Sequence, residues 1–478
     1  MKDFRPDMSH TNTASGVSDG ASDVDVTSDA TIDAGAQTTV ESTTQPSMTA
    51  TLPTKYPTLS ANPLNAQQTA EVGKKLDAIR QSVMQDLGEK DALYIHRVYA
   101  TVVYGELLGR GILMLSGALQ HRHKRGKLSK STIGFWLTGT SLLTFSKILN
   151  NMELGHNVMH GQYDWMQHKH LNSQQFDWDI VCPAPLWQHS HNYLHHTFTN
   201  VVGRDHDVGY HLIRITDEQP WVNSDRFNLV KTGVLALIFE WAVAFHDIQI
   251  SMEEYRDDPN LATTMHQKSR ALFAKIGRQI GKDAIAMPVL ASLLGGKSGF
   301  VHSLMGNTFA NGIRNVWTWA VIFCGHFTEQ AHIYSKLDDN ESRGDWYVRQ
   351  MLGSSNLTGG KIFHIMTGNL SHQIEHHLFP DMPANRYASI APRVKAVCQE
   401  YGLHYNTGSF AKQLTQVIKR IHHFSKPDVA EKTSIAQSVD KPSADSETLR
   451  DDYPHVSPRR RKWLNRMPDF LAQAVAYV

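Results

Sequence analysis

The chain is poor in cysteine and carries almost no net charge. Its 478 residues include three cysteines, Cys182, Cys324 and Cys398, which lie far apart. This spacing excludes a disulfide scaffold, a zinc ribbon and a four-thiolate iron–sulfur cluster. Lysine plus arginine number 47 and aspartate plus glutamate 46, so no global positive field attracts nucleic acid, and we expect no nucleic-acid partner. The mean hydropathy of −0.36, taken alone, is typical of a soluble globular protein.

Two polar tails lower that average. Residues 1–60 are rich in Ser, Thr and Asp and hold almost no large apolar side chains. Such a tract cannot bury enough surface to offset its ordering entropy, so we expect it to be disordered. Residues 426–478 form a second polar tail that ends in PRRRKWLNRMPDFLAQAVAYV, a basic amphipathic segment suited to an anionic membrane surface. The remaining residues, 61–425, are predicted to form one much more apolar domain.

Apolar stretches with few charges recur within this domain. They are 99–119, 131–150, 232–250, 284–296 and 307–325. A membrane-spanning helix needs about 20 predominantly apolar residues, which 131–150 satisfies best and 284–296, with Pro288, does not. We therefore expect 284–296 to be interfacial or re-entrant. Buried helices of a soluble protein are an equally good explanation on hydropathy alone.

Histidine is the abundant residue, and its spacing is regular. Ten of the 27 histidines lie between positions 156 and 211. His156 and His160 are four residues apart, as are His191 and His195, so on a helix each pair shares a face. The segment NLSHQIEHHLFP adds a third cluster, and a single histidine ends the apolar run at CGHF. The members of these last two groups are His372, His376, His377 and His326.

Clustered histidines of this kind predict metal binding, because imidazole is a good ligand for Zn, Cu, Fe and Ni. One tetrahedral zinc takes four ligands, which is fewer than the clusters offer, so two metals are the economical interpretation. A metalloprotease helix is excluded because Asn157 stands where the general base Glu is needed. With no nearby thiolate or carboxylate in the patterns, we favour a redox iron pair that activates O₂.

The segments HNVMH (156–160), HNYLHH (191–196) and QIEHH (373–377) resemble the three histidine boxes of the membrane fatty-acid desaturases. The third box, HQIEHHLFPDMP, resembles that of front-end, linoleoyl-type and actinobacterial acyl-CoA desaturases. The resemblance implies a non-haem di-iron centre. The implied ligands are His156, His160, His191, His195, His196, His326, Gln373, His376 and His377. His372 is an alternative to Gln373, which stands where many relatives have a histidine. Some relatives carry a metal-assisting Asn four residues before the histidine outside the boxes, whereas here that position is Ile322.

The same resemblance implies an all-α, polytopic membrane protein with about four transmembrane helices. A helical cap on the cytoplasmic face would hold the di-iron site. Spans at 232–250 and 307–325 would return the chain to that face between the second and third boxes. HRHKRGKLSK (121–130) has five Lys or Arg residues, which the positive-inside rule places in the cytoplasm. Either 99–119 lies flat on the membrane or this loop breaks the rule.

The implied reaction is O₂-dependent introduction of a cis double bond into a fatty acyl chain, carried by CoA or by a membrane lipid. Trp187, Asn192 and Asn200 flank the second box and are predicted to line the substrate site, although packing would explain them equally well. The chain lacks the HPGG haem-binding segment and a G-x-G-x-x-G dinucleotide fingerprint. We therefore expect electrons from a separate reductase or ferredoxin.

Two other functions are compatible with the histidines. A fatty-acyl or alkane hydroxylase of the same histidine-box superfamily would use the same ligands but insert oxygen. A histidine-rich metal transporter is the non-enzymatic alternative. Transport sites usually lie near the bilayer midplane, whereas these clusters lie at the ends of the apolar segments, which favours the enzyme.

Overall fold

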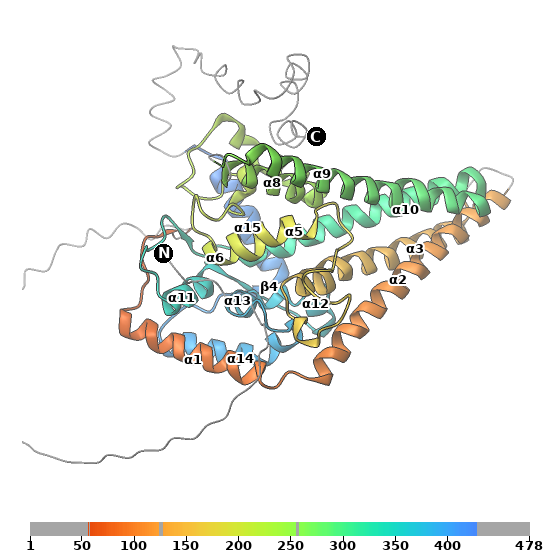
Figure 1. Cartoon of the computed structure of the whole chain (residues 1–478). Coiled ribbons are helices and arrows are strands. Elements are labelled where there is room, and N and C mark those ends of the chain that lie inside the picture. Colours follow the sequence, from red (N-terminus) through yellow and green to blue (C-terminus); the bar gives the residue numbers. More distant parts are fainter. Residues whose placement is uncertain (1–55, 57, 124–127, 255–257, 428–478) are drawn as a thin grey trace, which may run out of the picture. The chain divides into compact units, whose positions relative to one another are not determined.

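The computed structural model describes residues 56, 58–123, 128–254 and 258–427, and these form a predominantly helical structure, as predicted (Figure 1). Most of the two predicted tails, including the basic amphipathic segment at the carboxyl end, lies outside the described residues. Two short parallel strand pairs join distant parts of the chain: β1 (Thr58–Leu59) pairs with β2 (Ile333–Tyr334), and β3 (Asn356–Thr358) pairs with β4 (Thr407–Ser409).

The helices follow one another closely. In chain order they are α1 (Ala66–Met84), α2 (Glu89–Arg122), α3 (Lys130–Leu149), η1 (Asn150–His156), α4 (Asn157–Met159), η2 (Asp164–Met166), α5 (Ala184–Trp187), η3 (Gln188–His195), α6 (His196–Phe198), η4 (Gly209–His211), η5 (Asn223–Phe227), α7 (Asn228–Leu237), α8 (Phe239–Glu254), α9 (Leu261–Ile280), η6 (Gly281–Ala286), α10 (Met287–His326), α11 (Arg343–Gly353), α12 (Lys361–Met366), η7 (Leu370–His372), α13 (Gln373–Leu378), η8 (Ala384–Arg386), α14 (Tyr387–Glu400) and α15 (Phe410–Phe424).

Two helical hairpins lie side by side. The first consists of α2 and α3. The second is made by α9, η6 and α10, whose chain reverses at Gly296, where φ is +50° and ψ is −141°. The reversal is evident from residues on either side of it, because Asn307 donates a hydrogen bond of 2.6 Å to the Asp283 carbonyl. The segment 284–296, predicted to be interfacial or re-entrant, continues the helix through η6 and turns at its end; its depth in a membrane stays a prediction.

Small residues let the hairpins approach closely. A Cβ on Gly117 of α2 would meet the Cα of Gly299 on α10, and a Cβ on Gly109 would lie 2.8 Å from the Leu143 nitrogen of α3. Without a strong hydrophobic driving force in lipid, helices associate through close packing of such small residues. The glycines therefore fit a pair of hairpins that pack inside a membrane.

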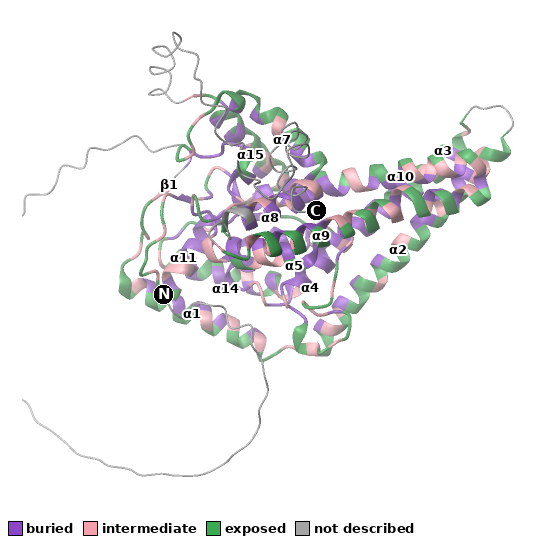
Figure 2. Cartoon of the chain, turned by 45° about the horizontal axis from the view of Figure 1, so that its top comes forward, coloured by how far each residue is buried: buried purple, intermediate pink, exposed green. Residues whose placement is uncertain are grey.

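Apolar side chains remain exposed along the hairpins, where Figure 2 shows exposed residues alternating with buried ones. Leu107 of α2 is 62% exposed and Leu293 of α10 is 75% exposed. Two helical stretches, Glu89–Arg122 and Leu261–His326, are long and apolar enough to cross a membrane. Exposed apolar surface of this extent marks a membrane or protein contact. The protein is therefore membrane-associated.

The remaining expected spans behave differently. The α3 helix is not one of these two stretches. It is less apolar, because seven of its 20 residues are Ser or Thr. The predicted span 232–250 is bent by 101° between α7 and α8, so it is not one straight span. The helix α2 packs lengthwise against α3 and α10, so residues 99–119 do not lie apart from the hairpins.

A hydrophobic core outside the hairpins holds the third histidine box in place. It is formed by α1, α11, α13 and α14, with Leu76, Tyr347, Phe379 and Tyr387 fully buried between them. The side chain of Asn65 caps α1 by accepting from the Gln68 backbone amide at 2.9 Å. This core fixes α13, which carries the third histidine box.

Candidate metal centre

The histidine boxes lie on short helices, two of which are irregular. The first box spans the π-helical turn η1 and α4 directly after α3. The second spans the π-helical η3 and α6, and the third lies on α13. In a π-helix each turn is one residue wider than in an α-helix, a distortion frequent at functional sites. Both widened turns change the direction of the imidazoles relative to the regular helix that the spacing predicts.

The structure brings seven of the predicted ligands into two groups, and an eighth, His196, into contact with members of both. The first group comprises His156, His160, His191 and His376, and the second comprises His195, His326 and His377. In each group one ligand atom per residue lies within 4.8 Å of the others. His196 joins the two groups, because it forms a further cluster with His376 and His377. The sequence separates these residues by up to 221 positions, so only the fold unites them.

Several ligand nitrogens lack a hydrogen-bond partner, and others lie close to one another. The buried Nε2 atoms of His160, His196 and His376 have no hydrogen-bond partner. The Nε2 atoms of His326 and His377 lie 3.0 Å apart, and those of His156 and His191 lie 3.3 Å apart. Nitrogens bound about 2.1 Å from one ion are separated by roughly this distance. Buried polar atoms are rarely left unpaired, so the arrangement fits two metal ions.

The opposite ring nitrogens are held by neighbouring side chains. His195 Nδ1 lies 3.0 Å from the Asp205 carboxylate and His377 Nδ1 lies 2.9 Å from Gln350 Oε1. His376 Nδ1 lies 3.3 Å from the Tyr387 hydroxyl. Partners of this kind fix the tautomer and orientation of a metal-binding imidazole. Gln350 and Tyr387 carry no sequence signal for this role, because each lies on a different helix from the histidine that it contacts.

Burial governs the protonation of the site. It lowers the pKa of His156 to about 4 and that of His196 well below its ordinary value. The neutral imidazole that remains is the metal-binding form. Burial opposes protonation of His195 too, but the adjacent Asp205 carboxylate outweighs it and raises the pKa. Burial raises the pKa of the Glu375 carboxyl, within the third box, to about 7.

The two alternatives in the third box occupy different places. Gln373 is buried and its Nε2 lies 2.9 Å from His326 Nε2, while its Oε1 has no partner. His372 stacks on His364 with ring centroids 4.8 Å apart and joins none of the metal-binding groups within the described residues. Gln373 is therefore placed at the histidine cluster and His372 is not.

A narrow, largely enclosed cavity begins at the first histidine group. His156, His191 and Trp187 line it, and the Trp187 indole stacks on His191 at a centroid distance of 4.4 Å. Ile322, at the position of the family's metal-assisting Asn, lines the same cavity. Of the three predicted substrate residues, only Trp187 lines this cavity.

The other two predicted substrate residues bind backbone. The Asn192 amide donates to the Met159 carbonyl at 2.9 Å. The Asn200 amide donates to the carbonyls of His332 and Gly353 at 2.9 and 2.8 Å. Neither lines the cavity, so both are placed to stabilise the loops around the second box.

Comparisons with known proteins agree with the site. The model of the family described as "Fatty acid desaturase" matches residues 131–409. A Mycobacterium tuberculosis "NADPH-dependent stearoyl-CoA 9-desaturase" is 43% identical over 356 residues, which cover 74% of this chain and 79% of that protein. A Synechocystis "sn-1 linoleoyl-lipid 6-desaturase" is 25% identical over 56% of this chain and 74% of its own. Human "Fatty acid desaturase 3" is 33% identical over 20% of this chain and 21% of its own.

Proposed function

The chain belongs to the fatty acid desaturase family, and we propose that it introduces a double bond at carbon 9 of a saturated acyl-CoA. It is thus an oxidoreductase of fatty-acid metabolism. The choice of an 18-carbon acyl-CoA is supported by the 43% identity to a protein named for that reaction, whereas the lipid-linked 6-desaturase is 25% identical. We assign the desaturase domain to residues 61–425.

The observation that carries this proposal is the convergence of two histidine groups with unpartnered ligand nitrogens. We propose two iron ions as the cofactor, held by His156, His160, His191, His195, His196, His326, His376 and His377, with Gln373 beside His326. When bound, the irons would supply the O₂-activating redox chemistry that breaking unactivated C–H bonds requires. The chain's own groups orient this site, because Asp205, Gln350 and Tyr387 fix the imidazole rings.

The protein also positions the acyl chain and excludes water. The cavity at His156 and His191 has a mostly apolar wall, in which Trp187 holds one side. The ligand histidines His160, His195 and His376 are at most 4% exposed. A buried site keeps bulk water away from reactive carbon. We propose that the two adjacent carbons that lose hydrogen lie at the histidine end of this cavity.

Electrons come from outside the chain. Reduction of O₂ to two waters takes up four electrons, of which the two cleaved C–H bonds supply two. A separate electron-transfer protein, reduced in turn by NADPH, would supply the other two electrons, with two protons from solvent. The NADPH dependence in the relative's name supports this source, and the chain carries no dinucleotide fingerprint. Turnover with substrate, iron and O₂ but without a reductant would contradict it.

We propose that four helical segments cross the membrane: α2, α3, the arm that ends at Gly295 and the returning arm that ends at His326. The histidines lie at the ends of α3 and α10 remote from the two turns. Gly296 at one turn lies against His121 at the other, with a Cβ placed 3.1 Å from the imidazole. With the active site in the cytoplasm, the basic loop 121–130 would lie outside and break the positive-inside rule.

One experiment separates desaturation from hydroxylation. The full chain is expressed in membranes and given stearoyl-CoA, NADPH, O₂ and an electron-transfer protein with its reductase, and the acyl products are analysed by mass. A product lighter by two hydrogens, with its double bond at carbon 9, supports the proposal. A product heavier by one oxygen supports the hydroxylase, and an unaltered substrate contradicts both.

A further inference from the structure

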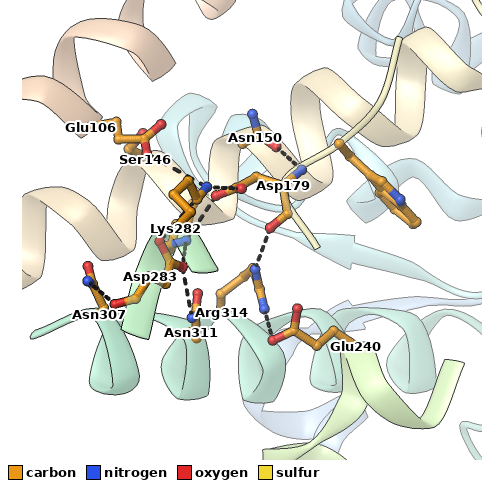
Figure 3. A network of polar contacts seen from close by, with 12 residues as sticks. Glu106, Ser146, Asn150, Asp179, Glu240, Lys282, Asp283, Asn307, Asn311 and Arg314 are labelled. Atoms are coloured by element: carbon orange, nitrogen blue, oxygen red, sulfur yellow. Dashed lines mark hydrogen bonds and ion pairs between the residues drawn. The ribbon is translucent and has the colours of Figure 1, made fainter. Parts of the chain in front are cut away.

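A network of charged side chains, most of them buried, lies between the hairpins and the α7–α8 bend (Figure 3). We call it the charge cluster; its members are Glu106, Arg110, Lys147, Asp179, Glu240, Lys282, Asp283 and Arg314. At one end of it, Arg314 of α10 forms an ion pair with Glu240 of α8. Both side chains are at most 8% exposed. Arg314 also donates to the Asp179 carbonyl at 3.0 Å, so the guanidinium is held from two sides.

Asn315 completes this end of the cluster. Its Oδ1 accepts from the Arg314 guanidinium at 3.0 Å, and its Nδ2 donates to the Leu237 carbonyl at 3.0 Å. Glu240 is fixed further because the Val181 amide donates to its carboxylate at 3.2 Å. These contacts tie α10 to the bend between α7 and α8, so the group has little freedom to move aside.

The group separates two cavities. The cavity that begins at the metal centre extends along α10 from Ile322 to Arg314. A second, more open cavity of about 630 Å³ continues along α10 from Val316 to Leu304, beneath the α7–α8 bend. Glu240 and Asn315 line both cavities. They therefore form the wall between them.

We propose that Glu240, Arg314 and Asn315 form the end wall of the acyl channel and set how many carbons can lie beyond the new double bond. The inference rests on the proposed function and adds its chain-length selectivity. Advancing the methyl end past this wall would break a buried ion pair, and an unpaired buried charge costs more than burial of one methylene gains.

The length of the first cavity agrees with the proposed substrate. Ile322, which lines the cavity together with His156 and His191, lies seven residues from Asn315, which is about 10 Å along a helix with a rise of 1.5 Å per residue. Carbon–carbon bonds of about 1.52 Å advance an extended chain by roughly 1.3 Å per carbon. This span therefore matches the length of roughly eight carbons, and because the cavity volume is about 50 Å³, the side chains that line it must move apart to admit the chain. An 18-carbon chain desaturated at carbon 9 has about eight carbons beyond the double bond.

The test compares Asn315→Ala with the wild-type full chain, using saturated acyl-CoAs of increasing length and the electron donors named above. Removing the amide opens the wall towards the second cavity. We expect kcat/KM for the 20-carbon substrate, relative to the 18-carbon one, to rise at least about tenfold, since each methylene in an apolar pocket changes kcat/KM by about 10- to 200-fold. The double bond should stay at the same position from the thioester.

Asn311→Ala is the matched control. Asn311 lies one turn away on α10 and lines only the second cavity, where its amide donates to Asp283 at 3.1 Å. Its chain-length profile should equal that of the wild type. If Asn315→Ala desaturates with the wild-type ratio of kcat/KM for the 20-carbon and 18-carbon substrates, the proposed end wall is wrong, while the proposed function stands. A wild-type chain that forms no unsaturated product from any substrate would instead refute the proposed function.

A second variant serves if Asn315→Ala does not fold. Val243 lines the first cavity on α8, three residues after Glu240. Val243→Phe narrows the channel on the metal side of the wall and should shift the preferred substrate to a chain shorter by about two carbons, with at least about a tenfold change in the kcat/KM ratio. An unchanged preference would overturn the proposal.

Discussion

The metal centre and the charge cluster both bury many ionisable side chains, but they differ in how these are partnered. In the charge cluster, Asp283 lies 2.8 Å from both Arg110 and Lys147, and Lys147 also reaches Asp179 at 2.9 Å. At the metal centre, buried nitrogens of His160 and His376 have no partner. Buried charges that are fully paired stabilise the structure, whereas buried ring nitrogens without a hydrogen-bond partner indicate metal binding.

The strongest test of this contrast is His195→Ala. Removing a first ligand while leaving the others in place should reduce unsaturated product by well over the 10- to 100-fold expected for an outer partner. The protein should still reach the membrane, because the charge cluster is untouched. Iron content and product are measured together, with exposed His404→Ala as the control. Full activity of His195→Ala would remove it from the ligand set.

Asp283→Ala should have the opposite signature. It leaves the buried charges of Arg110 and Lys147 without a shared partner, which costs about 3–5 kcal/mol of stability. Thermal unfolding in detergent measures the loss. The fraction that remains folded should bind iron as the wild type does, because no ligand is altered. If the folded variant instead loses iron while its stability is unchanged, the charge cluster contributes to metal binding and not to stability, which contradicts the contrast drawn above.

Asp205→Asn tests the connection between orientation and metal binding. The substitution keeps the size of the side chain at His195 Nδ1 but removes its charge. We expect iron affinity or turnover to fall by about 10- to 100-fold, less than for the loss of His195 itself. Titration with a chelator measures the affinity. An affinity equal to that of the wild type would mean that Asp205 only packs against the ring.

The smallest effect is expected at α1, remote from both regions. Asn65→Ala removes the helix cap and should lower stability by about 1 kcal/mol. Neither iron content nor chain-length preference should change. A change in either one would show that the core around α1 is coupled to the metal centre more tightly than its packing indicates.

The histidine boxes were predictable because their chemistry is local in sequence. Spacing alone singled out His156 with His160 and His191 with His195, and the fold places the first three in one group and His195 in the adjoining one. Spacing could not predict the π-helical turns at η1 and η3, because these depend on tertiary packing. The partnership of Gln350 with His377 was equally hidden, since it joins helices that the sequence does not relate.

The membrane segments were predicted less well. Hydropathy treats 284–296 as a short isolated run, whereas the structure continues α9 through η6 and turns only at Gly296. The bend between α7 and α8 was not predicted either, because the hydropathy of a segment does not show whether its helix is straight. Charged residues such as Arg110 and Asp283 lower the hydropathy of their segments. The structure buries these two residues as an ion pair, which hydropathy cannot show.

The metal content of the purified, full-length wild-type chain tests the central claim most directly. Elemental analysis combined with X-ray absorption at the iron edge gives the identity, number and ligand type of the bound metal. We predict about two iron ions per chain, bound by nitrogen and oxygen without sulfur. A chain that holds fewer than about one iron when fully active, or that binds its metal through sulfur, would contradict it.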